Sequence, residues 1–326
     1  MSWKQRYLPP DASHWQGRTD TPANACFFQI IQYLDLTQPF TSPTQTAFAF
    51  LGFRSDEGIR RNFGRIGAAT GAFALREAIA KLPIQRDHLL CFDAGDITCD
   101  DGDLESAQQA LGKAVAHLLS HHITPILLGG GHEIAFGHYQ GINAALPDQA
   151  VSIVNLDAHF DMRPLLVQQK GSSGTPFLQI ANLLKMENKP FQYYCIGIQN
   201  TGNTRALFET ANAHQVAILL AEDMQSGNQC NQFINTLLTN EKQLYFTICL
   251  DAFAAPYAPG VSAPQPLGLT PWQVIPLVRQ LAASGKVISY DLAELSPPND
   301  DNQRTAKLAA TLIYEIIHHH PLKTAG

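Results

Sequence analysis

Short apolar runs alternate with stretches of helical periodicity along most of the chain. The apolar runs are Ala47–Phe53, Leu89–Phe92, runs ending at Gly129, Leu156, Ile198, Leu220 and Asp251, and Lys286–Tyr290. Among the stretches between them, residues 71–82 and 103–121 have helical spacing, and Asp103 is expected to cap the second of these helices. Near-continuous apolar strands separated by helices indicate a parallel sheet with helices on both faces. The pattern therefore predicts an α/β fold.

The chain shows no internal repeat and no low-complexity linker, so residues 1–326 are expected to form a single domain. Residues 1–44 are rich in Pro and Thr and have little periodicity, which indicates an extended N-terminal arm lying on that domain. The segment Ala255–Pro264 is too rich in proline for regular structure. We expect it to form a rigid wall of the functional site.

Metal-ligand side chains follow the run that ends at Leu156. Asp157, His159 and Asp161 are spaced two apart, and in extended backbone alternate side chains point to the same side. Carboxylate oxygen combined with imidazole nitrogen suits Mn, Fe or Zn better than Mg or Ca. The alternative is a strand end whose polar side chains face solvent.

Two other strand ends favour the metal site over this alternative. His132 follows the glycine turn Gly129–Gly131, and Cys249 and Asp251 lie at the end of a third apolar run. In open parallel sheets, ligands bind beyond the carboxyl ends of the strands. Three strand ends that carry ligand-type residues therefore predict one shared site at that edge of the sheet.

Charge and composition narrow the classes of partner. A formal net charge of −6 argues against nucleic acid, because phosphate binding relies on clustered Lys and Arg. No apolar run reaches the roughly 20 residues of a membrane span. The polar N-terminal segment lacks the apolar core of a signal peptide, so we expect a cytoplasmic location. The six cysteines form no C-x-x-C pair, and all except Cys249 are expected to be reduced and packed as small hydrophobes.

Several of these motifs resemble those of one known family. The segments Gly129–Glu133, Asp157–Asp161 and Asp251 with Ala258–Gly260 are similar, in order, to the three metal motifs of the arginase (ureohydrolase) superfamily. Within it, Trp15–Arg18, Ser55–Gly67, Ser173–Phe177 and Ala258–Pro264 look most like the formimidoylglutamase branch. The likeness covers most of the chain.

The resemblance implies a three-layer α/β/α domain around a mostly parallel eight-stranded sheet, with two Mn²⁺ ions per subunit. One ion would be held by His132, Asp157, Asp161 and Cys249, and the other by Asp157, His159, Cys249 and Asp251. Asp161 would also take the proton of the attacking hydroxide, and Glu294 would hydrogen-bond the amidine-like nitrogens of the substrate. For Glu294 the alternative is a solvated acid at a strand end.

Two residues depart from the wider family. Cys249 lies where the usual pattern is Asp-x-Asp, and a thiolate offers one soft sulfur where a carboxylate offers two hard oxygens. The identity of the metal and the occupancy of the second site are therefore left open. Ser173 lies where arginases carry a His, so a histidine proton shuttle is missing, which fits the formimidoylglutamase branch.

The resemblance implies metal-dependent hydrolysis of N-formimidoyl-L-glutamate to L-glutamate and formamide in histidine breakdown. We expect Asn62, Arg65, Ser173 and Glu294 to bind this small-molecule substrate, because Arg matches carboxylates bidentately. The alternative is that the arginines of this loop are solvated, or paired to Asp56 and Glu57, and do not bind substrate. A ureohydrolase acting on agmatine or guanidinobutyrate and a metal-poor, non-catalytic regulatory relative are the other functions considered. A homo-oligomer is also left open.

Overall fold

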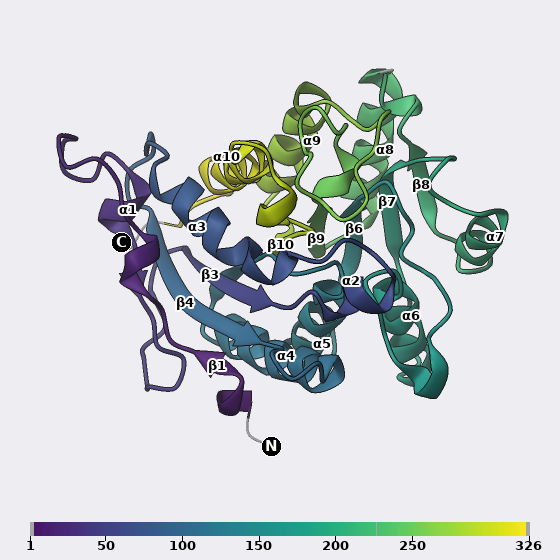
Figure 1. The fold of residues 1–326 in the computed structure, drawn as a ribbon, viewed down its shortest axis with the longest axis horizontal. Coiled ribbons are helices and arrows are strands. Elements are labelled where there is room, and N and C mark those ends of the chain that lie inside the picture. The colour runs from purple at the N-terminus through teal and green to yellow at the C-terminus, as the bar shows by residue number, and fades with distance from the viewer. Residues whose placement is uncertain (1–2, 226, 324–326) are drawn as a thin grey trace.

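The computed structural model describes residues 3–225 and 227–323, so residues 1–2, 226 and 324–326 of the expected domain lie outside it. Its centre is a twisted sheet of parallel strands in the spatial order β4, β3, β5, β10, β9, β6, β7, β8 (Figure 1). These strands are β3 (Ala47–Arg54), β4 (Leu90–Thr98), β5 (Ile123–Leu128), β6 (Ser152–Leu156), β7 (Tyr193–Ile198), β8 (Ala217–Leu220), β9 (Leu244–Cys249) and β10 (Val287–Ala293).

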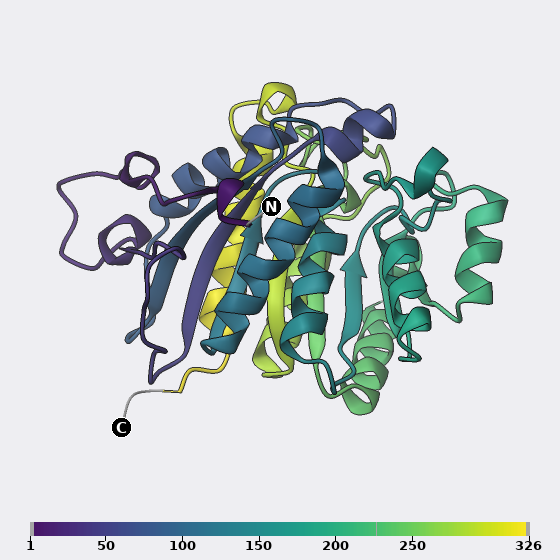
Figure 2. The ribbon, with the colours of Figure 1, turned by 90° about the horizontal axis from the view of Figure 1, so that it is seen from below.

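Helices cover both faces of this sheet (Figures 1 and 2). The helices are α1 (Phe27–Ile30), α2 (Glu57–Arg61), α3 (Gly71–Ala80), α4 (Leu104–Ser120), α5 (Ile134–Ala145), α6 (Pro176–Met186), α7 (Arg205–Ala213), α8 (Gly227–Asn240), α9 (Pro271–Ala283) and α10 (Arg304–His319). One layer contains α3, α8, α9 and α10, and the other contains α4, α5 and α6. The expected three-layer α/β/α fold with a mostly parallel sheet is therefore confirmed; the expected eight strands are β3 to β10.

The two apolar cores follow from the alternation of side chains along the strands. In β3, Phe48 and Phe50 pack into the core beneath α3 and α10, whereas Ala49 and Leu51 pack into the core beneath α4. Successive side chains of a strand point to opposite faces, so a strand covered on both faces must be apolar throughout. This requirement explains the continuous apolar runs in the sequence. Among the described residues, no helix is both long and apolar enough to cross a bilayer.

Strand β4 is longer than predicted. Its second half contains buried charged residues, which the apolar pattern did not assign to a strand. Asp93 and Asp96 belong to the strand, and both form ion pairs with Arg76 of α3, at 2.9 and 2.7 Å. Arg76 is only 1% exposed, and its charge compensates the two carboxylates in the core. Sequence patterning ended the strand at Phe92 because an Asp–Ala–Gly–Asp segment is typical of a turn.

The N-terminal arm lies along the β4 edge of the sheet and adds two short strands, which brings the sheet to ten. β1 (Tyr7–Leu8) pairs antiparallel with β4, and β2 (Gln32–Tyr33) pairs parallel with it. Between them, the buried indole of Trp15 donates a hydrogen bond to Asp93 at 2.7 Å. The arm thus contributes to the buried ion network. That the whole chain forms a single domain stays a prediction.

Candidate metal centre

The predicted metal ligands and the predicted substrate-binding residue Glu294 meet at the carboxyl ends of four adjacent strands. His132 follows β5, Asp157, His159 and Asp161 follow β6, and Glu294 follows β10, while Cys249 is the last residue of β9 and Asp251 lies just beyond it. The prediction that extended backbone points Asp157, His159 and Asp161 to the same side was wrong. β6 ends at Leu156, Asp161 has a left-handed φ of 47°, and residues Leu250–Ala252 form a 3₁₀ turn. Loop geometry, not strand alternation, brings these side chains together.

Asp157 lies between two groups of ligand atoms. In the first group, ligand atoms of His132, Asp157 and Cys249 lie within 4.8 Å of one another. His132 Nδ1 is 2.9 Å from an oxygen of Asp157 and 2.9 Å from an oxygen of Asp161.

In the second group, ligand atoms of Asp157, His159 and Asp251 lie within 4.8 Å of one another. His159 Nδ1 is 3.4 Å from Asp157 Oδ1 and 3.2 Å from Asp251 Oδ2. Asp157 presents Oδ2 to His132 and Oδ1 to His159, which is how a carboxylate bridges two ions.

The glycine turn after β5 is needed to deliver His132. Gly129 and Gly130 have φ values of 74° and 79°, which side chains rarely adopt. A Cβ on Gly129 would lie 2.7 Å from the backbone nitrogen of Ala72. Glu294 also has a positive φ of 74°, and its carboxylate accepts a hydrogen bond from the backbone of His132 at 3.1 Å. Strained backbone at a non-glycine residue is typical of functional sites.

Burial and mutual charge shift the pKa values of these groups strongly. Burial opposes protonation of His132, but the carboxylates of Asp157 and Asp161 outweigh it and raise its pKa well above the ordinary value. Burial and the charge of Asp157 raise the pKa of Asp161 to about 6. Burial and the charge of Asp251 raise the pKa of Glu294 well above its ordinary value. The crowded acidic groups therefore favour the binding of protons or of cations at this site.

Cys249 is buried inside this carboxylate cluster. Burial, followed by the charges of Asp157 and Asp251, raises the pKa of its thiol well above the ordinary value. The thiol therefore ionises only with a cation beside it. The other five cysteines are also free thiols, as predicted.

The residues present fit divalent cations. Asp251 Oδ1 and Glu294 Oε2 are buried polar atoms without a hydrogen-bond partner among the described residues, and His132 Nδ1 meets only oxygens of Asp157 and Asp161. Buried polar atoms normally have partners, so these atoms indicate a missing ligand. Imidazole nitrogen and carboxylate oxygen are suitable donors for Mn²⁺.

A cavity of about 620 Å³ opens above the ligands, and all four predicted substrate-binding residues line it. Asn62 Nδ2 donates a hydrogen bond to Ser173 Oγ at 3.2 Å, so these two lie together. Glu294 lies at the floor with Asp161, Cys249 and Asp251.

Arg65 lies on the wall with its guanidinium partly engaged. Its Nε and Nη2 donate to the carbonyl oxygens of Ser262 and Val261, at 3.2 and 2.5 Å. These bonds hold it against the proline-rich segment, which lines the cavity through Ser262 and Ala263 as expected.

Arg163 is a candidate that the sequence reasoning missed. It lines the cavity, it is exposed, and within the described residues its guanidinium has no hydrogen-bond or ion-pair partner. Its backbone nitrogen donates to Gly174 at 2.8 Å, which places it beside the Ser173 loop. No local pattern marks Arg163 as a cavity residue, because the fold brings it beside a loop that lies ten residues further along the chain.

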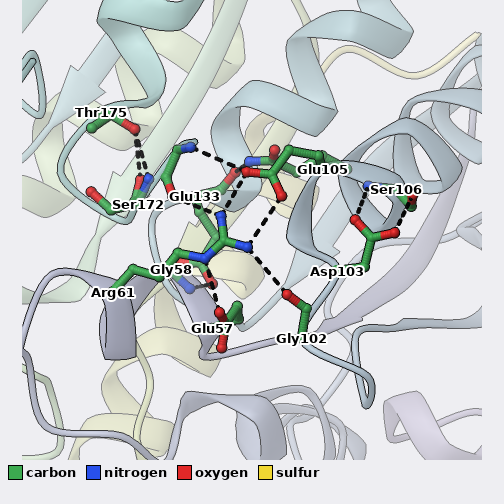
Figure 3. Close-up of polar contacts among 12 residues, drawn as sticks. Glu57, Gly58, Arg61, Gly102, Asp103, Glu105, Ser106, Glu133, Ser172 and Thr175 are labelled. Atoms are coloured by element: carbon green, nitrogen blue, oxygen red, sulfur yellow. Dashed lines mark hydrogen bonds and ion pairs between the residues drawn. The ribbon is translucent and has the colours of Figure 1, made fainter. Parts of the chain in front are cut away.

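Arg61 connects three loops around the cavity (Figure 3). It forms ion pairs with Glu57 at 2.8 Å and Glu105 at 2.6 Å, and donates to the carbonyl oxygens of Gly102 and Gly171. The nearby Glu133 accepts hydrogen bonds from Ser55 and from the backbone of Gly58, both at 3.0 Å. These contacts hold α2, and therefore Asn62, against the loop that carries Ser173.

Comparisons with known proteins agree with this geometry. A family model described as "Arginase family" matches residues 46–319. The formimidoylglutamase of Legionella pneumophila (strain Lens) is 44% identical over 316 residues, covering 95% of this chain and 97% of the relative. That of Geobacillus sp. (strain WCH70) is 42% identical over 328 residues, covering 98% and 99%. The structure of Trypanosoma cruzi formiminoglutamase with Mn²⁺ superposes with a TM-score of 0.76 at 26% identity, covering 83% of this chain and 92% of that one. The chain therefore belongs to the arginase family.

Proposed function

We propose that this chain hydrolyses N-formimidoyl-L-glutamate to L-glutamate and formamide, as a step of histidine breakdown. The observation that carries the proposal is one cavity with an acidic, metal-binding floor and a wall that bears Arg65 and Arg163. A substrate with an amidine, a carboxylate on the adjacent carbon and a second carboxylate at the end of its side chain matches this separation of charge. The names of relatives that are 39–44% identical over nearly the full length support the same substrate.

We propose two Mn²⁺ ions per subunit at this floor. His132, Asp157, Asp161 and Cys249 would hold one ion, and Asp157, His159, Cys249 and Asp251 the other. Divalent ions at such a site lower the pKa of water and so supply a nucleophile at neutral pH. The Mn²⁺-bound Trypanosoma cruzi structure supports the choice of metal.

The chain's own carboxylates position the reacting groups and move the proton. Glu294 accepts hydrogen bonds from the amidine nitrogens of the substrate. Asp161, which lines the cavity beside His132, takes a proton from the attacking water and returns it to the glutamate nitrogen. As the bond between the formimino carbon and that nitrogen breaks, the added hydroxyl loses its proton to the carboxylate of Asp161, and formamide and glutamate leave. Ser173 cannot replace a histidine in this transfer, which leaves the proton with Asp161.

The substrate carboxylates are assigned to the cavity wall. Arg163 offers a guanidinium with no partner among the described residues, and Arg65 retains Nη1 for a ligand. Asn62 and Ser173 add neutral hydrogen-bond donors beside them. A guanidino substrate without acidic groups, such as agmatine, would leave these arginines unpaired. The expected cytoplasmic location and a homo-oligomeric state stay predictions.

Metal analysis combined with a product assay tests the function. The purified chain should contain or take up Mn²⁺ and release formamide from N-formimidoyl-L-glutamate, and it should release little urea from agmatine or guanidinobutyrate. His159→Ala should abolish turnover and leave circular dichroism unchanged, because His159 lies between two carboxylates of the site. Comparable urea release would favour the ureohydrolase alternative. Absence of both metal binding and turnover would favour the regulatory one.

A further inference from the structure

A connected set of buried polar side chains lies beneath His132, on the side away from the cavity. We call Thr247, Asp291, Tyr245, His138 and Ser289 the buried polar chain; all five are 0% exposed. Asp291 lies opposite Thr247 in the register of β9 and β10, Ser289 lies opposite Tyr245, and His138 approaches from α5. Buried polar groups cost stability unless they are fully paired, so five of them together need an explanation.

The buried polar chain begins at the metal ligand. His132 Nε2 lies 3.0 Å from Thr247 Oγ1, and the Thr247 hydroxyl donates to Asp291 Oδ1 at 2.5 Å. The second oxygen of Asp291 is 2.7 Å from His138 Nδ1 and accepts a hydrogen bond from the Tyr245 hydroxyl. His138 Nε2 in turn lies 2.5 Å from Ser289 Oγ.

The directions of the hydrogen bonds in the buried polar chain determine which ring nitrogen of a neutral His132 carries the proton. The Thr247 hydroxyl has a single proton, and it donates that proton to Asp291 Oδ1. The hydroxyl oxygen of Thr247 can then only accept, and the proton it accepts is the one on His132 Nε2. A neutral His132 consequently presents a lone pair at Nδ1, the nitrogen that lies 2.9 Å from Asp157 and Asp161. The network assigns the metal-binding tautomer.

We propose that Thr247 and Asp291, supported by His138 and Tyr245, are positioning residues that set the Mn²⁺ affinity of the ion held by His132. This inference rests on the proposed metal-dependent function. A carboxylate that receives the second ring proton of a ligating histidine fixes the ring and raises its basicity, and here a threonine hydroxyl transmits the effect. Loss of such a partner typically weakens metal binding about 10- to 100-fold.

The test is a Mn²⁺ titration of metal-free protein, followed by electron paramagnetic resonance, which separates single from paired ions. Thr247→Val keeps the shape and removes the hydroxyl, so it should weaken one of the two sites about 10- to 100-fold and leave the other. Thr247→Ser restores a hydroxyl and should recover wild-type affinity. Asp291→Asn, which removes the charge, should resemble Thr247→Val.

A matched control separates this role from loss of packing. Asp93→Asn alters another fully buried carboxylate, paired to Arg76 and Trp15, and should lower the Tm with Mn²⁺ affinity unchanged. The inference would be overturned if both Thr247→Val and Asp291→Asn bound Mn²⁺ at both sites with wild-type affinity. If the wild-type chain itself bound no Mn²⁺, the proposed function would fail instead, so the two failures are distinguishable.

Discussion

At the level of single residues, Cys249 is the position where this chain departs furthest from the donor set that Mn²⁺ prefers. The residue lies 1% exposed among Asp157, Asp251 and Glu294, and its sulfur is within reach of His132 and Asp157. A thiolate there would favour softer ions and would be open to oxidation. The departure is therefore expected to weaken the affinity of the site for Mn²⁺.

We predict that Cys249→Asp raises Mn²⁺ occupancy toward two ions per chain, because a carboxylate offers two hard oxygens to bridge the ions. Metal content after dialysis against limiting Mn²⁺ is the measurement. Cys91→Ser, at a buried thiol outside the site, serves as the control and should leave occupancy unchanged. A fall in both occupancy and rate in Cys249→Asp would show that the surrounding residues are adapted to sulfur.

A second prediction concerns the arginines on the cavity wall. Arg163→Ala should raise KM for formimidoylglutamate by roughly one to three orders of magnitude with a smaller effect on kcat, each tenfold step being about 1.4 kcal/mol. Arg65→Ala should raise KM as well, because its Nη1 faces no carbonyl acceptor among the described residues. Arg205→Ala, at an exposed side chain on α7, should change neither parameter. An unchanged KM in both cavity variants would place the carboxylate pocket elsewhere.

At the level of elements, helix α2 and the loop that carries Ser173 are joined through Arg61. The guanidinium contacts Glu57 within α2 and Glu105 at the start of α4 (Figure 3). It also donates to the carbonyl oxygen of Gly171. Glu105 also accepts a hydrogen bond from the backbone nitrogen of Gly171 at 3.2 Å. The planar guanidinium of Arg61 has several donors and makes these contacts simultaneously, whereas the ammonium group of a lysine does not.

We therefore predict that Arg61→Lys raises KM several-fold and leaves Mn²⁺ content unchanged, because the loops carrying Asn62 and Ser173 lose their common anchor. Steady-state kinetics with metal analysis would measure both effects. The matched control is Arg60→Lys, since the neighbouring Arg60 is exposed and pairs only with Glu57 among the described residues. Equal KM values for the two variants would argue against a positioning role for Arg61.

The end of α10 provides an element-level prediction about pH. His320, just beyond the last residue of α10, is only 9% exposed, and its Nδ1 lies 3.0 Å from the Tyr290 hydroxyl. Burial, followed by the charge of Arg86, lowers its pKa to about 4. In the unfolded chain the pKa of histidine is about 6.5, so between pH 6.5 and 4 the unfolded state binds the extra proton.

As pH falls from 6.5 to 4, His320 should therefore lower the free energy of unfolding by on the order of 3 kcal/mol. Above pH 6.5 the residue is neutral in both states and contributes no pH dependence. His320→Gln should flatten the pH profile of urea unfolding in this window, whereas His319→Gln, at the more exposed neighbour, should not. Parallel profiles for His320→Gln and the wild-type chain would refute the assignment.

At the level of the whole molecule, the sequence predicted the parallel sheet and the meeting of its strand ends because apolar runs and ligand-type residues are local signals. It did not reveal the length of β4, because the partner that compensates Asp93 and Asp96 is Arg76, which lies on a separate helix. Arg163 and the Thr247–Asp291 contact were missed for the same reason. Neighbours brought together by the fold have no signature in local spacing.

Because of this architecture, metal binding is expected to raise the free energy of unfolding of the whole fold. Residues 132, 157 and 249 lie at the ends of three strands that are distant in sequence, so bound ions would crosslink these parts of the carboxyl edge of the sheet. Without cations, the crowded carboxylates around Asp157 repel one another. Ligand that binds only the folded chain at 100 times its Kd adds about 2.7 kcal/mol per site.

We predict that removal of Mn²⁺ with a chelator lowers the Tm by several degrees and that added Mn²⁺ restores it, while Mg²⁺ at the same concentration restores less because it prefers an all-oxygen shell. Differential scanning calorimetry measures the shift. His159→Ala and Asp251→Asn should each lose most of this stabilisation, because both remove ligands of the second group. A Tm that is independent of Mn²⁺ in the wild-type chain would mean that the cluster is folded and satisfied without ions, and the metal centre would have to be abandoned.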